Sequence, residues 1–168
     1  MNWAQFIVQW LHVLLAIFWF GSALYSDVIL IPAISTLPIV RQREIGEPIG
    51  RRGSRIIRPV IVIVILLGIL RGTVFGPIQS LDRLTTAYGL TWLLALATAS
   101  ATAAWSFRVI IPAIDRMNAI SLAEAVGADG NPTQVLVAAI DNVKRALTLE
   151  LIGFFIIFTA MILMRFGL

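Results

Sequence analysis

The chain has 168 residues, of which 59% are hydrophobic and 13% are charged, and its mean hydropathy is +0.92. Soluble domains carry about 25% charged residues, so this chain has too little polar surface to enclose a core in water. It has no cysteine, which excludes disulfides, thiolate zinc sites, cysteine-bound iron–sulfur clusters and covalently attached haem. The composition therefore predicts an integral membrane protein.

The formal net charge is +4, and a basic chain can bind nucleic acid. The Lys and Arg residues, however, lie beside apolar segments and form no continuous basic stripe. We expect them to set the membrane topology and to contact anionic lipids at the cytoplasmic face. The sequence predicts no nucleic-acid partner.

Four segments are long and apolar enough to cross a hydrocarbon core of about 30 Å. They cover residues 3–31, 59–75, 86–111 and 147–164. In lipid each segment must be a helix, because an isolated strand would leave its backbone groups unpaired. The sequence thus predicts an all-α, four-transmembrane-helix bundle that forms one membrane domain, residues 1–168.

The two longer connections, residues 35–58 and 115–146, lie on the same side of this predicted bundle. Together with the adjoining helix ends they hold ten of the 13 Lys and Arg residues, whereas Arg71, Arg83 and Arg165 lie on the other side. By the positive-inside rule both connections are expected to be cytoplasmic. Both termini are then on the non-cytoplasmic side, and we expect the membrane to be a bacterial inner membrane.

The connections differ in their local patterns. The glycines and prolines of residues 35–58 predict a short interfacial helix that is interrupted by turns. In the second connection a turn is predicted at residues 127–132. Thr133 is then expected to cap a helix that extends the fourth segment towards the cytoplasm.

A short internal repeat indicates how the helices are arranged. The sequence Ile-Pro-Ala-Ile closes the first segment at residues 31–34 and the third segment at residues 111–114, an offset of 80 residues. Both segments cross the membrane in the same direction, so the repeat predicts two parallel tandem hairpins. The alternative is a chance match of apolar residues around a proline.

His12 is the only histidine in the sequence, and it lies in the outer half of the first predicted helix. Ionisable side chains are costly at membrane depth, so each is a candidate functional residue. A neutral imidazole can bind haem iron or copper, or relay a proton. The alternative is a histidine that is bonded to a carbonyl or to headgroup water. A haem with two histidine ligands would require a dimer, and otherwise the second axial ligand must be of another type.

Arg71 lies near the outer end of the second predicted helix, at a depth similar to that of His12. Its guanidinium group could bind a haem propionate or a lipid phosphate. The alternative is that the side chain reaches out to the headgroups. His12 and Arg71 are therefore the predicted cofactor-binding residues, with His12 as the metal ligand.

Asp27, Arg108 and Glu150 lie near the predicted cytoplasmic ends of the first, third and fourth helices. A carboxylate that faced lipid would be costly, so Asp27 is expected to face the bundle and to pair with Arg108 or Arg145. The functional alternative is a proton or cation path along these polar residues.

Two further patterns have more than one interpretation. Met161 and Met164 share one helix face and thioethers can bind copper(I), but their apolar surroundings favour core packing. The third segment is rich in Ala, Ser and Thr. Such residues allow close helix packing, room for a flat cofactor, or a face for a partner subunit.

Two segments resemble the copper-resistance protein D superfamily. The first helix of that family typically contains a Leu-His pair, then a Trp and a Gly, which this chain has as Leu11, His12, Trp19 and Gly21. A later family segment begins with a Tyr-Gly pair and ends in an Arg and a Pro, which match Tyr88, Gly89, Arg108 and Pro112. The matching residues lie within the ranges 10–34 and 81–114.

This superfamily includes proposed copper importers, four-helix proteins of unassigned function, and a membrane-bound protoporphyrinogen oxidase type that resembles a haem b protein. The resemblance implies a copper or haem b role with His12 as the ligand. This chain has Leu94 and Ala95 where related sequences often have a Lys, so the resemblance does not extend to the oxidase activity.

The sequence contains no hydrolase, phosphate-loop, dinucleotide or zinc-protease motif, and an enzyme is not expected. The predicted function is binding of a metal or haem b through His12. One alternative is a non-catalytic accessory subunit of a larger respiratory or photosynthetic membrane complex, and a second is a copper permease. The chain could act as a homodimer or within such a complex.

Overall fold

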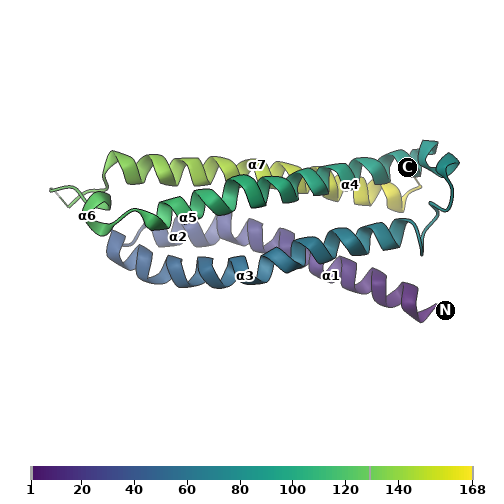
Figure 1. Ribbon diagram of the computed structural model, residues 1–168, viewed down its shortest axis with the longest axis horizontal. Coiled ribbons are helices and arrows are strands. Elements are labelled where there is room, and N and C mark those ends of the chain that lie inside the picture. Colours follow the sequence, from purple (N-terminus) through teal and green to yellow (C-terminus); the bar gives the residue numbers. More distant parts are fainter. Residues whose placement is uncertain (1, 129, 168) are drawn as a thin grey trace.

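The computed structural model describes residues 2–128 and 130–167 as an elongated bundle of four long helices that lie side by side (Figure 1). The first comprises α1 (Trp3–Tyr25), the π-helical turn η1 (Ser26–Leu30) and α2 (Ile31–Ser35). The second is α3 (Ile39–Gly72), and the fourth is α7 (Gln134–Arg165). The third comprises α4 (Ala87–Trp105), the π-helical turn η3 (Ser106–Ile110) and α5 (Ile111–Ala119). The connections contain a short 3-10 helix, η2 (Leu81–Thr85), and the single-turn helix α6 (Leu122–Ala125).

All four long helices are apolar enough to span a membrane, which confirms the predicted four-helix membrane bundle. Each contains between 32 and 34 residues, a length of about 50 Å at a rise of 1.5 Å per residue. The hydrocarbon core is only about 30 Å thick. The helices must therefore project from the membrane on at least one side.

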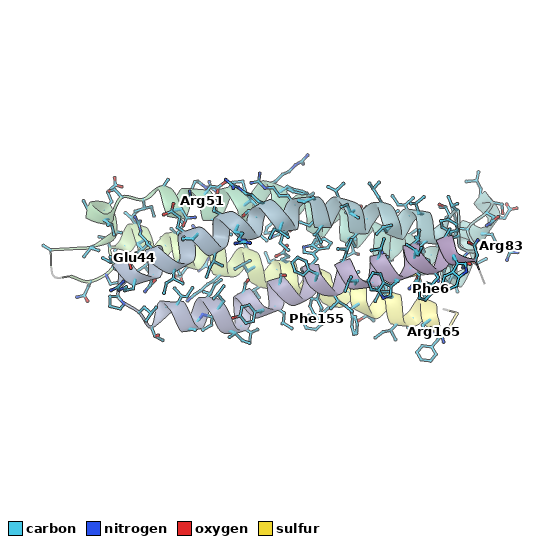
Figure 2. All side chains as sticks on the ribbon, turned by 90° about the horizontal axis from the view of Figure 1, so that it is seen from below. Phe6, Glu44, Arg51, Arg83, Phe155 and Arg165 are labelled. Carbon is cyan, nitrogen blue, oxygen red and sulfur yellow. The ribbon has the colours of Figure 1, made fainter. Side chains whose placement is uncertain are left out.

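The two ends of the bundle differ in charge and in what they contain. Both termini lie at one end, and α6 and the turn between α2 and α3 lie at the other (Figure 1). Glu44 and Arg51 lie towards the α6 end, whereas Arg83 and Arg165 lie at the end that holds the termini (Figure 2). The outer surface between them carries exposed apolar side chains such as Phe155 (Figure 2), which is 54% exposed and meets Phe20 of α1 edge to face. Such a surface is suited to lipid.

The second helix begins at Ile39, so the interrupted helix predicted for residues 35–58 was wrong. Pro48 and Pro59 both lie inside α3, although proline removes a backbone hydrogen bond. The glycines on this stretch did not break the helix either. They line a cavity, and a Cβ added at any of them would meet no atom within 4 Å, as found for Gly46, Gly50 and Gly53. Propensity was overridden here because α3 packs along α1 and α2.

The internal repeat has a structural counterpart. In both copies a π-helical turn precedes the Ile-Pro-Ala-Ile sequence, η1 in the first and η3 in the second. The N–H of Ile31 bonds to the carbonyl of Ser26, and the N–H of Ile111 bonds to that of Ser106. Since each following proline lacks an N–H, the wider turn re-pairs the backbone at the point where an α-helix would lose a bond. The helices of each hairpin, α1 with α3 and α4 with α7, make the most extensive contacts.

The second connection follows its prediction more closely. The Thr133 hydroxyl accepts a hydrogen bond from the N–H of Leu136 at 3.5 Å and so caps α7, which confirms the predicted cap. Thr133 also donates to the carbonyl of Glu124 at 2.6 Å, which ties α6 to the start of α7. The fourth helix therefore extends well beyond the predicted span of residues 147–164.

A buried apolar cluster fills the middle of the bundle. Trp19 and Phe154 meet edge to face with ring centroids 4.8 Å apart, and Ile61 is only 1% exposed. Val60, Val64 and Ala103 complete the cluster. It joins both hairpins and divides the interior into two halves.

Candidate functional sites on either side of the central cluster

Two cavities of similar size flank this cluster. The first, here called the His12 cavity, has a volume of about 480 Å³ and lies towards the end that holds the termini. The second, the Glu150 cavity, has a volume of about 420 Å³ and lies towards the α6 end. Trp19 lines both cavities. The central cluster is therefore a shared wall.

The imidazole of His12 is held by the helix opposite. Its Nδ1 lies 3.1 Å from the carbonyl oxygen of Val64 on α3. A carbonyl only accepts hydrogen bonds, so this contact assigns the hydrogen to Nδ1 and leaves a lone pair on Nε2. Nε2 has no hydrogen bond with any residue that the structure describes, and His12 lines the cavity. A histidine that binds a metal is typically oriented in this way.

Two glycines of α3 make room for the rings at this wall. A Cβ at Gly68 would come within 3.1 Å of Cε1 of His12, and a Cβ at Gly72 would overlap the indole of Trp92. Trp92 donates from Nε1 to the carbonyl of Gly68 at 3.4 Å. Trp92 is also the residue 80 positions after His12. The repeat-related positions thus place two rings against one short stretch of α3.

Two arginines lie at the same end of the His12 cavity. Arg71 is half-buried and donates to the side-chain carbonyl of Gln9 on α1, which holds its guanidinium beside the cavity. Arg165 comes from the last turn of α7, and both arginines line the cavity. The structure therefore brings His12 and Arg71 together, as their predicted common depth requires.

Sequence reasoning assigned the two methionines of α7 to core packing. Met161 and Met164 are both half-buried and both line the His12 cavity. Their thioethers therefore share a cavity with the one imidazole. The signal in the sequence was their common helix face, but the sequence did not indicate that this face lies opposite His12.

Glu150 is only 7% exposed and lies on the wall of the second cavity. It contacts Ser106 in the turn η3, whose hydroxyl also lies 3.0 Å from the carbonyl of Thr102. This partner was missed, because it lies 44 residues away along the chain. The signal was Glu150 itself, since a carboxyl group in an apolar helix requires a polar partner.

The predicted ion pair of Asp27 is not formed. Among the residues that the structure describes, the ion pairs are Arg41 with Glu44 and Arg51 with Glu47. Arg108 is exposed, and so is the other predicted partner, Arg145. The long arginine side chains remain at the surface, where they need not be desolvated. Asp27 is half-buried in the turn η1, which packs against α7.

No protein-family model, curated protein or solved structure matches the chain. The resemblance to the copper-resistance protein D superfamily stays a prediction from Leu11, His12 and the other matching residues.

Proposed function

We propose that the protein binds haem b in the His12 cavity, where Nε2 of His12 would hold the iron. The observation that carries this proposal is the hydrogen bond between Nδ1 of His12 and the Val64 carbonyl. It fixes the tautomer and the ring orientation that a metal ligand needs. Nothing in the proposal requires the protein to be an enzyme.

The size and lining of the cavity support this ligand. Its volume of about 480 Å³ lies within the range of about 300–1,000 Å³ that is usual for small-molecule sites. Its walls are mainly apolar, with polar groups gathered at one end, among them Arg71 and Arg165. An amphipathic ring system with carboxylate substituents fits this division, because guanidinium groups pair well with carboxylates.

A methionine of α7 could provide the second ligand of the haem iron in place of a second histidine. Haem iron accepts a histidine and a methionine together, and Met161 and Met164 line the same cavity as His12. One chain therefore supplies both types of axial ligand. When bound, the haem iron would supply one-electron chemistry.

The test is the absorption spectrum of the full-length protein, purified from cells that make haem. We expect a Soret band, which His12→Ala abolishes. Met161→Ala and Met164→Ala are expected to shift the band, whereas Met117→Ala, which alters a methionine of the other cavity, leaves it unchanged. A colourless protein that takes up no added haemin would refute the proposal.

Copper(I) is a second candidate, because an imidazole and two thioethers are suitable soft ligands in one cavity. Among the described residues no group of three or more His, Asp and Glu side chains could hold a metal. The cavity therefore suits copper(I) better than harder divalent ions, which prefer oxygen ligands. Metal analysis separates the two candidates. A permease would in addition take up copper in vesicles.

The orientation in the membrane is part of the proposal. The α6 end carries exposed arginines, among them Arg41, Arg51 and Arg116, and we place it on the cytoplasmic side of a bacterial inner membrane, against anionic lipids. The third alternative, an accessory subunit, is favoured by small exposed residues on one face of α4, Ala97, Ala101 and Ala104. Co-purification of a stoichiometric partner would support it.

A further inference from the structure

We propose that Glu150 is a protonated carboxylic acid at neutral pH, and that it exchanges its proton with the α6 side of the membrane through the Glu150 cavity. The site is separate from the His12 cavity, and the inference does not depend on haem binding. Glu150 is a buried acid that forms no ion pair among the described residues.

The Ser106 hydroxyl has more contacts than hydrogens. The Ser106 hydroxyl contacts two oxygens, the carbonyl of Thr102 at 3.0 Å and a carboxyl oxygen of Glu150. A hydroxyl has one hydrogen, so it can donate to only one of them. If Glu150 is protonated, it donates to Ser106 and Ser106 donates to Thr102. Every contact then has a hydrogen, whereas an ionised Glu150 would leave one contact between two acceptors.

The surrounding charges point the same way. The charged groups on the cavity wall are Arg43 and Glu47 of α3 and Lys144 of α7. Asp27 lies in η1, which packs against α7, and it is a second acid rather than a cationic partner. None of these groups forms an ion pair with Glu150 among the described residues. An unpaired carboxylate is costly inside a membrane bundle, and protonation removes that cost.

The cavity gives the acid a route to one side only. It extends along α7 from Leu136 to Glu150, fourteen residues or about 21 Å along the helix. Its wall is mainly apolar, but Ser22 and Ser26 add hydroxyl groups beside the Glu150 carboxyl as polar partners for water. A volume of about 420 Å³ leaves room for that water. Trp19 and Ile61 close the end that faces the His12 cavity.

Release of the proton has a defined local consequence. The proton passes from Glu150 to water in the cavity, and the Ser106 hydrogen turns from the Thr102 carbonyl to the new carboxylate. The Thr102 carbonyl keeps its backbone hydrogen bond from the N–H of Ser106. The acceptor of the Ser106 hydroxyl in η3 therefore depends on the protonation state of Glu150, while the backbone of the turn stays paired.

The test is infrared spectroscopy of the full-length protein in lipid bilayers at neutral pH. We expect the carbonyl stretch of a protonated carboxylic acid, which Glu150→Gln removes and which Glu124→Gln, at an exposed glutamate, leaves intact. Transfer to D₂O should shift the band, because the cavity admits water. Ser106→Ala should move the band without removing it, since the acid loses its acceptor.

Several outcomes would overturn the proposal. The band could be absent at neutral pH, or it could disappear in Asp27→Asn and survive in Glu150→Gln. Loss of the band when sodium replaces choline as the salt cation would identify a metal-ion site instead. The thermal midpoint of unfolding serves as the control that each variant is folded. Glu150→Gln should leave it nearly unchanged, because the introduced amide can also donate to Ser106, whereas a marked loss would indicate an ionised native side chain.

Discussion

The two cavities differ more in chemistry than in size. The His12 cavity, of about 480 Å³, presents an imidazole and two thioethers with arginines at one end. The Glu150 cavity, of about 420 Å³, has a buried carboxyl group, and its cationic residues are Arg43 and Lys144. Under the two proposals, one cavity would offer lone pairs to a metal and the other a proton. The central cluster separates two cavities whose linings differ in chemistry.

The repeat explains how one architecture supports both. Ser26 and Ser106 occupy equivalent positions in the two π-helical turns, and both line the Glu150 cavity. Only Ser106 contacts Glu150. At the other end the equivalent positions hold different rings, His12 and Trp92. The scaffold is close to symmetric, whereas the reactive side chains are not.

The largest expected effect is at the wall that the cavities share. Trp19→Ala removes a side chain that is 4% exposed and packs against Phe154. We expect a loss of about 3–5 kcal/mol of stability, measured as the free energy of unfolding in detergent micelles. The variant should also disturb both sites. Loss of function at only one cavity, with unchanged stability, would show that the wall is not shared.

The next effect is confined to the Glu150 side. A Cβ at Gly153 would overlap the hydroxyl of Thr102, so Gly153→Ala should cost about 1–3 kcal/mol and move the infrared band of Glu150. Gly46→Ala is the matched control, because nothing lies within 4 Å of its added methyl group. We expect the control to be stabilised by about 0.5–1 kcal/mol. Equal effects at the two glycines would contradict the packing described here.

A smaller effect is expected on the His12 side. Gly68→Ala brings a methyl group to 3.1 Å from Cε1 of His12, and the ring must tilt by a few tenths of an ångström. Affinity for haemin should fall about ten-fold, as for other changes to groups that orient a metal ligand. The measurement is haemin titration by absorption, with Gly21→Ala as control, since nothing lies within 4 Å there. The Glu150 band should not respond, and a response would mean that the sites are coupled.

The sequence was sufficient for the features that depend on local pattern. Hydropathy placed the four spans, and the residue type at Thr133 indicated the start of α7. Depth along each helix also placed His12 and Arg71 at one level. These features need no knowledge of which helix faces touch.

The features that were missed depend on contacts between helices. An arginine partner was predicted for Asp27, whereas no partner was predicted for Glu150, which the fold brings against the hydroxyl of Ser106. Met161 and Met164 were assigned to packing because the position of α7 relative to His12 was unknown. The continuous α3 was missed because glycine and proline are weak predictors where a neighbouring helix supports the backbone.

The smallest expected effect compares Glu150 with a glutamate in water. Glu124 accepts hydrogen bonds from the backbone N–H of Ser121 at 3.0 Å and from its hydroxyl at 2.9 Å, and these donors hold the pKa of Glu124 below its usual value. Because the folded pKa is depressed, this contact stabilises α6 above the unfolded pKa and is lost as the pH falls through the folded pKa. The expected result is a carbon chemical shift of Glu124 that titrates at lower pH than in an unstructured peptide, and Ser121→Ala should raise its midpoint. The infrared band of Glu150 should stay constant over the same acid range, since that acid is already protonated. A Glu150 band that grows as Glu124 becomes protonated would mean that Glu150 is ionised at neutral pH, as Glu124 is, and would contradict the proposal.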